Sequence, residues 1–165
     1  MKKRSLILLL SSVIVILEFL PISYTYNNDA ATLYVKEHAE NRSQGLCAKY
    51  VRKAIEAGGC PTYGHPKHAC KYHSFLLKLG FEEYDDINAY HPVKGDIVVI
   101  DSYGSHESGH IAMFDGKRWY SDFPQKNMFG LRGKQPTKQQ YCIYHKPDGK
   151  YYRRLSLLSR WMPAK

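Results

Sequence analysis

The first half of the chain carries the apolar spacing of helices. One helix is expected over residues 30–40, with Asp29 as its cap. A second helix is marked more strongly, because its apolar residues fall at i, i+1, i+4, i+7 and i+8 while basic residues take the opposite face. These apolar residues are Cys47, Ala48, Val51, Ala54 and Ile55. The Gly58–Gly59 pair ends this helix, and a third helix is expected over residues 69–79.

The second half of the chain changes to the spacing of strands. Residues 97–100 form a β-branched run, and a further strand is expected over residues 140–145. Between them, residues 110–114 and 117–123 flank Asp115-Gly116, a dipeptide typical of a β-hairpin turn. Helices followed by antiparallel strands predict an α+β domain, with N-terminal helices packed on a central antiparallel sheet.

The N-terminal segment has the pattern of an export signal. Three basic residues, Lys2, Lys3 and Arg4, precede an apolar run over residues 5–23. Three interpretations stay open: a cleaved signal peptide over residues 1–25, an uncleaved anchor in the inner membrane, or a buried helix of a soluble protein. The first two export the rest of the chain to the periplasm or the extracellular space, and the second also associates it with a membrane.

Length and charge narrow the choice of partner. The 165 residues suffice for one domain, expected over residues 27–147 and followed by a basic extension over residues 148–165. The formal net charge of +9 indicates an anionic partner. Nucleic acid would not explain an export signal, and no glycine-rich phosphate motif is present. The extension is either packed against the domain or an amphipathic basic element for anionic lipid.

Cys47 and His110 are candidates for nucleophilic chemistry. Cys47 opens a helix on its inward face, where backbone N–H groups and the helix dipole stabilise a thiolate. His110 opens a strand after a flexible loop. The two can meet across the helix–sheet interface as nucleophile and general base. The alternative is that Cys47 is a small buried core residue.

Four segments resemble the NlpC/P60 and CHAP superfamily of cysteine peptidoglycan hydrolases. Residues 43–55 resemble the nucleophile helix, residues 95–99 the strand before the catalytic His, and residues 109–114 the His strand. Residues 119–123 are similar to the next strand in the amidase branch that includes type VI secretion effectors. The resemblance, over residues 30–147, implies a papain-like fold and hydrolysis of an amide in peptidoglycan stem peptides or of the sugar–peptide amide. It implies no metal or organic cofactor, and we expect a monomer.

The superfamily usually has a third polar group that orients the His. A two-residue Asp115-Gly116 turn would pair His110 with Ser121, whereas a three-residue loop would pair it with Asp122. The usual spacing in the superfamily favours Asp122, and a carboxylate stabilises imidazolium better than a hydroxyl does. The resemblance therefore implies a Cys47–His110–Asp122 site.

The resemblance also carries weaker expectations. The backbone N–H of Cys47 would form half of an oxyanion site, and Tyr34 is the upstream tyrosine that could help to polarise it. A non-catalytic wall-binding module on the same fold is the rival function, against which the intact Cys47, His110 and Asp122 argue. Type VI effectors usually lack a signal peptide, so the leader favours a housekeeping or secreted lytic role.

Two patterns look like metal sites. His106 to His110 spells His-Glu-x-x-His, but that motif requires a helix and here it runs into a strand. A second group has a spacing that fits no standard zinc ribbon; it comprises Cys60, His65, His68, Cys70 and His73. We expect no metal. Cys60 and Cys70 form either a disulfide that closes the intervening loop or two unpaired thiols.

Overall fold

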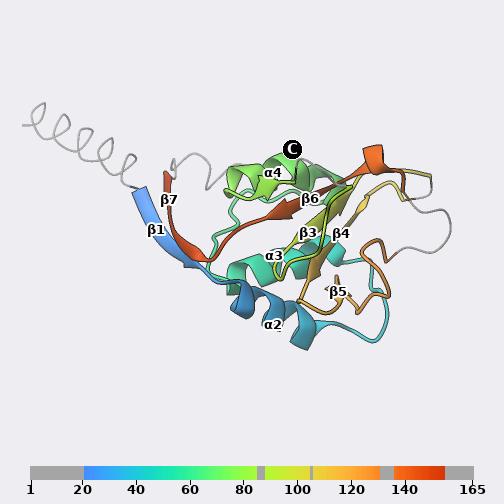
Figure 1. Ribbon diagram of the computed structural model, residues 1–165, viewed down its shortest axis with the longest axis horizontal. Coiled ribbons are helices and arrows are strands. Elements are labelled where there is room, and N and C mark those ends of the chain that lie inside the picture. Colours follow the sequence, from blue (N-terminus) through green and yellow to red (C-terminus); the bar gives the residue numbers. More distant parts are fainter. Residues whose placement is uncertain (1–20, 85–87, 105, 131–135, 155–165) are drawn as a thin grey trace, which may run out of the picture.

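A five-stranded antiparallel sheet lies at the centre of the computed structural model, which describes residues 21–84, 88–104, 106–130 and 136–154. Its strand order is β2-β6-β3-β4-β5. The strands are β2 (Glu82–Glu83), β3 (Ile97–Ile100), β4 (His110–Phe114), β5 (Trp119–Tyr120) and β6 (Tyr141–His145). A separate antiparallel pair, β1 (Pro21–Tyr26) with β7 (Gly149–Arg154), extends to one side of this domain (Figure 1).

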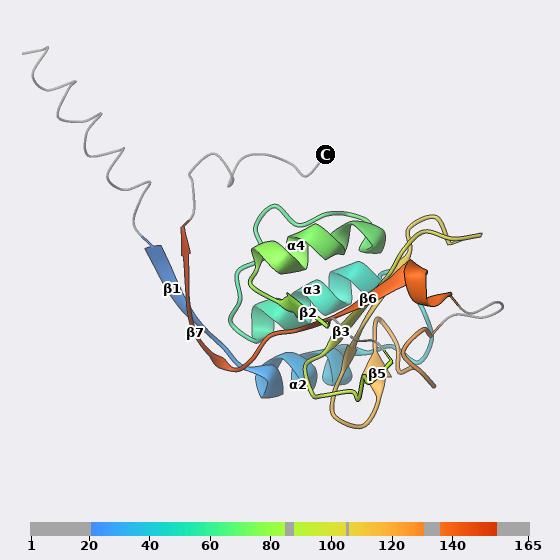
Figure 2. The same cartoon turned by 45° about the horizontal axis from the view of Figure 1, so that its top comes forward.

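The helices pack on one face of the sheet, as Figure 2 shows for α3 and α4. They are α2 (Asn28–His38), α3 (Cys47–Ala57) and α4 (Tyr72–Lys78), the last preceded by a short 3-10 helix, η1 (Ala69–Lys71). In β3, the side chains of Ile97 and Val99 join the core under the helices. Val98 and Ile100 pack on the opposite face under aromatic side chains from loops. Both faces of the central strand are therefore buried, which explains its uninterrupted β-branched sequence.

The α+β class and the antiparallel sheet under N-terminal helices are confirmed. The helix that was expected from residue 30 begins earlier, because Asn27 rather than Asp29 is its N-cap. The Asn27 side chain accepts a hydrogen bond from the backbone N–H of Ala30 at 2.7 Å. The predicted strand over residues 140–145 is present as β6, after a 3-10 turn, η2 (Lys138–Gln140).

The predicted β4–β5 hairpin is present, but both expected registers are wrong. Phe114 pairs with Trp119, so four residues connect the strands. The Asp115 carboxylate accepts hydrogen bonds from the backbone N–H groups of Lys117 (2.8 Å) and Arg118 (2.7 Å) and thereby stabilises the longer turn. β5 also ends at Tyr120, earlier than predicted, so His110 has neither Ser121 nor Asp122 as a β5 partner.

The β1–β7 pair lies largely outside the domain that was expected over residues 27–147. Tyr26 of β1 is fully buried in the main core, and the backbone N–H of Asn28 donates to Asp148 at 2.6 Å. These contacts join both strands to the domain. Most of the apolar run and the tail beyond residue 154 lie outside the described residues. Within the described part, no helix is long and apolar enough to cross a membrane.

Candidate active site

Cys47 is the first residue of α3 and is partly buried against the sheet. Burial raises the pKa of its thiol to about 11, although backbone N–H groups at Ile111 and Ala48 act in the opposite direction. We expected the helix terminus to favour a thiolate. Instead, the cost of burying the charged form is larger, so the thiol is protonated in the free protein.

His110 is the first residue of β4, pairs with Ile100 of β3 and is 5% exposed. Burial lowers the pKa of its imidazole to about 4, while the nearby charge of Asp122 partly opposes this shift. Gly109 allows the chain to enter β4 here, because a Cβ at this positive φ would lie 2.2 Å from the Ile100 carbonyl oxygen. His110 is therefore a neutral base at neutral pH, held on a rigid strand.

The structure brings Cys47 and His110 to one cleft of about 900 Å³. The thiol lies against the backbone N–H of Ile111, the residue after His110. No hydrogen bond joins the thiol and the imidazole among the described contacts. Hydrogen bonds of this kind often form only when substrate is bound. The pair therefore has the composition of a nucleophile and a base in a cleft that could hold a peptide segment.

Asp122 is fully buried and holds the loop that leads into α3. Its Oδ2 accepts hydrogen bonds from the backbone N–H groups of Gln44 (2.6 Å) and Leu46 (2.9 Å). Leu46, the N-cap residue, has no side-chain cap of its own, so Asp122 supplies one from across the chain. Among the described contacts, none is a hydrogen bond between Asp122 and His110. The Asp122 carboxylate therefore lies at the loop before Cys47. From there its negative charge raises the pKa of His110.

Gln125, which the sequence analysis did not single out, contacts the imidazole directly. Its Nε2 lies 2.7 Å from Nε2 of His110 and 2.8 Å from Oγ of Ser121. Ser121 in turn donates to Oδ1 of Asp122 at 3.0 Å. A buried polar chain therefore connects His110, through Gln125 and Ser121, to the carboxylate that holds the Cys47 loop. No periodic pattern marks Gln125, because it lies in the irregular segment that follows β5.

Two further expectations concern Tyr34 and the cysteines. Tyr34 lies on α2 with its ring stacked on His38 at a centroid distance of 3.8 Å, and it does not line the cleft of Cys47 and His110. None of the four cysteines forms a disulfide in the structure, so of the two alternatives for Cys60 and Cys70 the disulfide is not the one it has. Cys60 is buried just beyond the C-terminal end of α3, whereas the backbone N–H of Cys70 donates to Ser108, which lines the cleft at the opposite end.

The structure does not bring the residues of the metal-like patterns together as metal ligands. His106 lies in an isolated β-bridge with Tyr103 and His110 lies in a strand, so the two do not share a helix face. Among the described residues, no group of three or more His, Cys, Asp or Glu side chains could hold a metal ion.

Comparison with known proteins identifies the family. No protein-family model and no curated protein matches the chain. A solved structure does match: the type VI native effector–immunity complex Tae3-Tai3 from Ralstonia pickettii, at 35% identity and a TM-score of 0.62. The match covers 73% of this chain and 98% of the other. The chain belongs to the Tae3 family. A second Tae3-Tai3 structure from the same organism matches at 37% identity with a TM-score of 0.59, covering 70% of this chain and 98% of the other.

Membership of the Tae3 family agrees with the amidase branch of the sequence resemblance, which includes type VI effectors. The match covers nearly the whole of the Tae3 chain. The wider assignment to a papain-like NlpC/P60 fold stays a prediction.

Proposed function

We propose that this Tae3-family chain is an exported cysteine amidase that hydrolyses an amide bond of peptidoglycan in the periplasm. The observation that carries the proposal is the cleft lined by both Cys47 and His110 in a chain that spans a type VI effector. Cys47 is the nucleophile, His110 is the general base and acid, and no cofactor takes part. The bond is either within the stem peptide or between sugar and peptide.

The reaction begins from a neutral pair. As the Cys47 sulfur attacks the carbonyl carbon, its proton passes to His110, because neither the thiolate nor the imidazolium is stable beforehand. The backbone N–H of Cys47 at the start of α3 stabilises the developing oxyanion. His110 then gives the proton to the leaving amine, which leaves an acyl thioester on Cys47. Water activated by His110 hydrolyses this thioester and restores both groups.

Gln125 is the positioning residue for His110 in this proposal. Since its amide lies at Nε2 of the imidazole, Nδ1 is the nitrogen left to take the thiol proton. That role requires the imidazole proton to sit on Nε2 and to be donated to an acceptor. A half-turn of the Gln125 amide presents Oε1, which is buried without a hydrogen-bond partner, as that acceptor. Oε1 would then face Oγ of Ser121 as well, so the Ser121 hydroxyl would donate to Oε1 in place of Asp122.

Membership of the family also helps to decide whether the substrate is the producer's own cell wall or that of a competing cell. The matched structures are complexes of a type VI effector with an immunity protein. By this likeness, the chain is an effector aimed at a competing cell, and a cognate immunity protein would protect the producer. This proposal replaces the housekeeping role that an export leader favoured.

Digestion of purified sacculi tests the proposal. The wild-type chain should release soluble muropeptides, and mass spectrometry of their new amino and carboxyl groups identifies the bond that is cut. EDTA should leave the rate unchanged. If the chain binds sacculi but releases no fragments, it is a wall-binding module instead of an amidase.

A further inference from the structure

A second cleft, of about 660 Å³, also reaches Cys47. Its walls are the first two turns of α3 on one side and the loop of residues 64–69 on the other. It shares Gly45, Cys47 and Ser108 with the cleft of His110. The two clefts therefore meet at the nucleophile, and a chain bound across Cys47 would occupy both. We call the second one the α3 cleft.

The α3 cleft has an uncompensated positive charge. Three cations line it, Lys49, Arg52 and Lys67, and no carboxylate does. Arg52 is neutralised by Glu56 at 2.6 Å. The side-chain ammonium groups of Lys49 and Lys67 make no hydrogen bond or ion pair with any residue that the structure describes, and both residues are exposed. Two ammonium groups thus flank the path to Cys47 without a partner of opposite charge.

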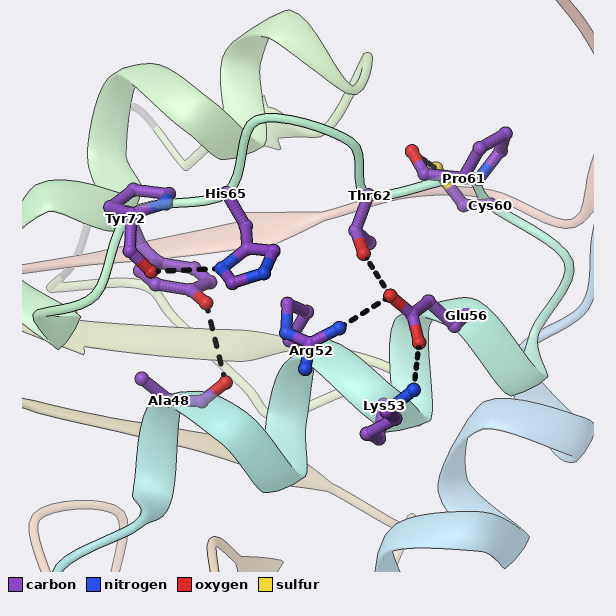
Figure 3. A network of polar contacts seen from close by, with 10 residues as sticks. Ala48, Arg52, Lys53, Glu56, Cys60, Pro61, Thr62, His65 and Tyr72 are labelled. Atoms are coloured by element: carbon purple, nitrogen blue, oxygen red, sulfur yellow. Dashed lines mark hydrogen bonds and ion pairs between the residues drawn. The ribbon is translucent and has the colours of Figure 1, made fainter. Parts of the chain in front are cut away.

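Hydrogen bonds hold the walls of the α3 cleft in place before any ligand binds (Figure 3). Glu56 accepts a hydrogen bond from the Thr62 hydroxyl, which ties the segment just before the loop to α3, and it also accepts one from Arg52. The Tyr72 hydroxyl donates to the carbonyl oxygen of Ala48 at 3.3 Å. A preformed cleft loses little entropy when a ligand enters it.

From these observations we infer that the α3 cleft is the subsite for a carboxylate-bearing segment of the substrate peptide. This inference rests on the proposed function and specifies the substrate at the same site. Lys49 and Lys67 bind the carboxylate, while Leu46, Pro66 and Ala69 supply apolar contacts for short aliphatic side chains. Stem peptides combine both features. An anionic peptide is therefore favoured over a neutral peptide of the same length.

A pair of substrates and a pair of variants test the subsite. The substrates are a stem peptide with free carboxylates and the same peptide with those groups amidated. The double variant Lys49→Gln/Lys67→Gln should raise KM for the free acid by about tenfold, with kcat within about twofold, since it removes ground-state binding. The amidated peptide should be insensitive. Lys36→Gln/Lys78→Gln, two exposed lysines away from both clefts, is the control with the same change in charge.

The outcomes separate the inference from the proposed function. If the wild-type chain cleaves both peptides with equal KM, and the double variant matches its control, hydrolysis stands and the subsite is wrong. If the wild-type chain cleaves neither peptide nor sacculi, the proposed function fails, and the subsite fails with it.

Discussion

At the scale of single residues, the site is built from groups whose charge is suppressed. Burial keeps the Cys47 thiol protonated and the His110 imidazole neutral, with pKa values of about 11 and about 4. Under the proposed mechanism, this resting state holds no reactive thiolate between turnovers. The thiolate would form only as substrate binds and the Cys47 sulfur attacks its carbonyl carbon. Two predictions follow from this state and from the contact that orients the imidazole.

The first concerns the pH dependence of hydrolysis. His110 must be unprotonated to accept the thiol proton, so kcat/KM should rise as pH increases through about 4, the pKa of His110 in the free protein. In parallel, iodoacetamide should alkylate Cys47 slowly at neutral pH, with a rate that increases up to about pH 11. Peptide mapping would separate Cys47 from the other cysteines. An acid limb near pH 6.5 would show that burial does not shift His110.

The second concerns Gln125. Gln125→Ala removes the partner of His110 Nε2, so kcat should fall by about tenfold or more while KM changes little. Gln125→Glu restores an acceptor with a charge that favours imidazolium, so it should recover part of kcat and move the acid limb to higher pH. Gln139→Ala, at an exposed position, is the control. Equal pH profiles for the Glu variant and the wild type would argue against a positioning role.

At the scale of elements, the patterned segments were predictable and their connections were not. The helical spacing at Cys47 and the β-branched runs place α3 against the sheet, which is enough to expect Cys47 and His110 in one cleft. The hairpin register depends on the Asp115 carboxylate. It accepts hydrogen bonds from two backbone N–H groups in the turn and so stabilises a longer turn than the sequence predicted. Gln125 lies in the irregular segment after that hairpin, where neither periodicity nor turn signals fix a side chain.

The loop before α3 carries a prediction of its own. Asp122→Asn removes the charge that accepts the N–H groups of Gln44 and Leu46, so it should lower the free energy of unfolding by about 1–3 kcal/mol. It should also lower kcat by at least about tenfold, because the loop sets the position of Cys47 and the charge acts on His110. Ser121→Ala should cost less in both measurements. If Asp122→Asn changed neither the free energy of unfolding nor kcat while Ser121→Ala lowered both, the proposed role of Asp122 at this loop would be wrong.

At the scale of the whole molecule, the β1–β7 pair joins the two ends of the described chain to the domain of the central sheet. Lys146, at the entry to β7, is fully buried, donates to the carbonyl oxygen of Leu79 at 2.8 Å and lies 3.3 Å from the Tyr151 ring centroid. Burial lowers the pKa of its ammonium to about 8. The sequence did not predict this pairing, because it depends on contacts between residues more than a hundred positions apart.

Lys146→Ala should therefore destabilise the protein without changing its chemistry. It leaves the carbonyl oxygen of Gly80 without its donor and that of Leu79 with the Tyr24 hydroxyl as its remaining side-chain donor, at a cost of about 2 kcal/mol in the free energy of unfolding. Denaturant unfolding measures the loss, and kcat at a temperature where the variant is folded should match the wild type. Lys150→Ala, on the exposed part of β7, is the control. Equal midpoints for the two variants would mean that the buried ammonium contributes nothing to stability.

The central claim is that Cys47 is the nucleophile, and trapping the acyl-enzyme tests it most directly. A stem-peptide substrate is mixed with excess wild-type chain, quenched in acid within the first turnover, and analysed by intact mass and peptide mapping. We expect a mass increase equal to the acyl fragment on the peptide that contains Cys47, and neither adduct nor product with Cys47→Ala. Hydrolysis by Cys47→Ala at the wild-type rate, or an adduct on another residue, would contradict it.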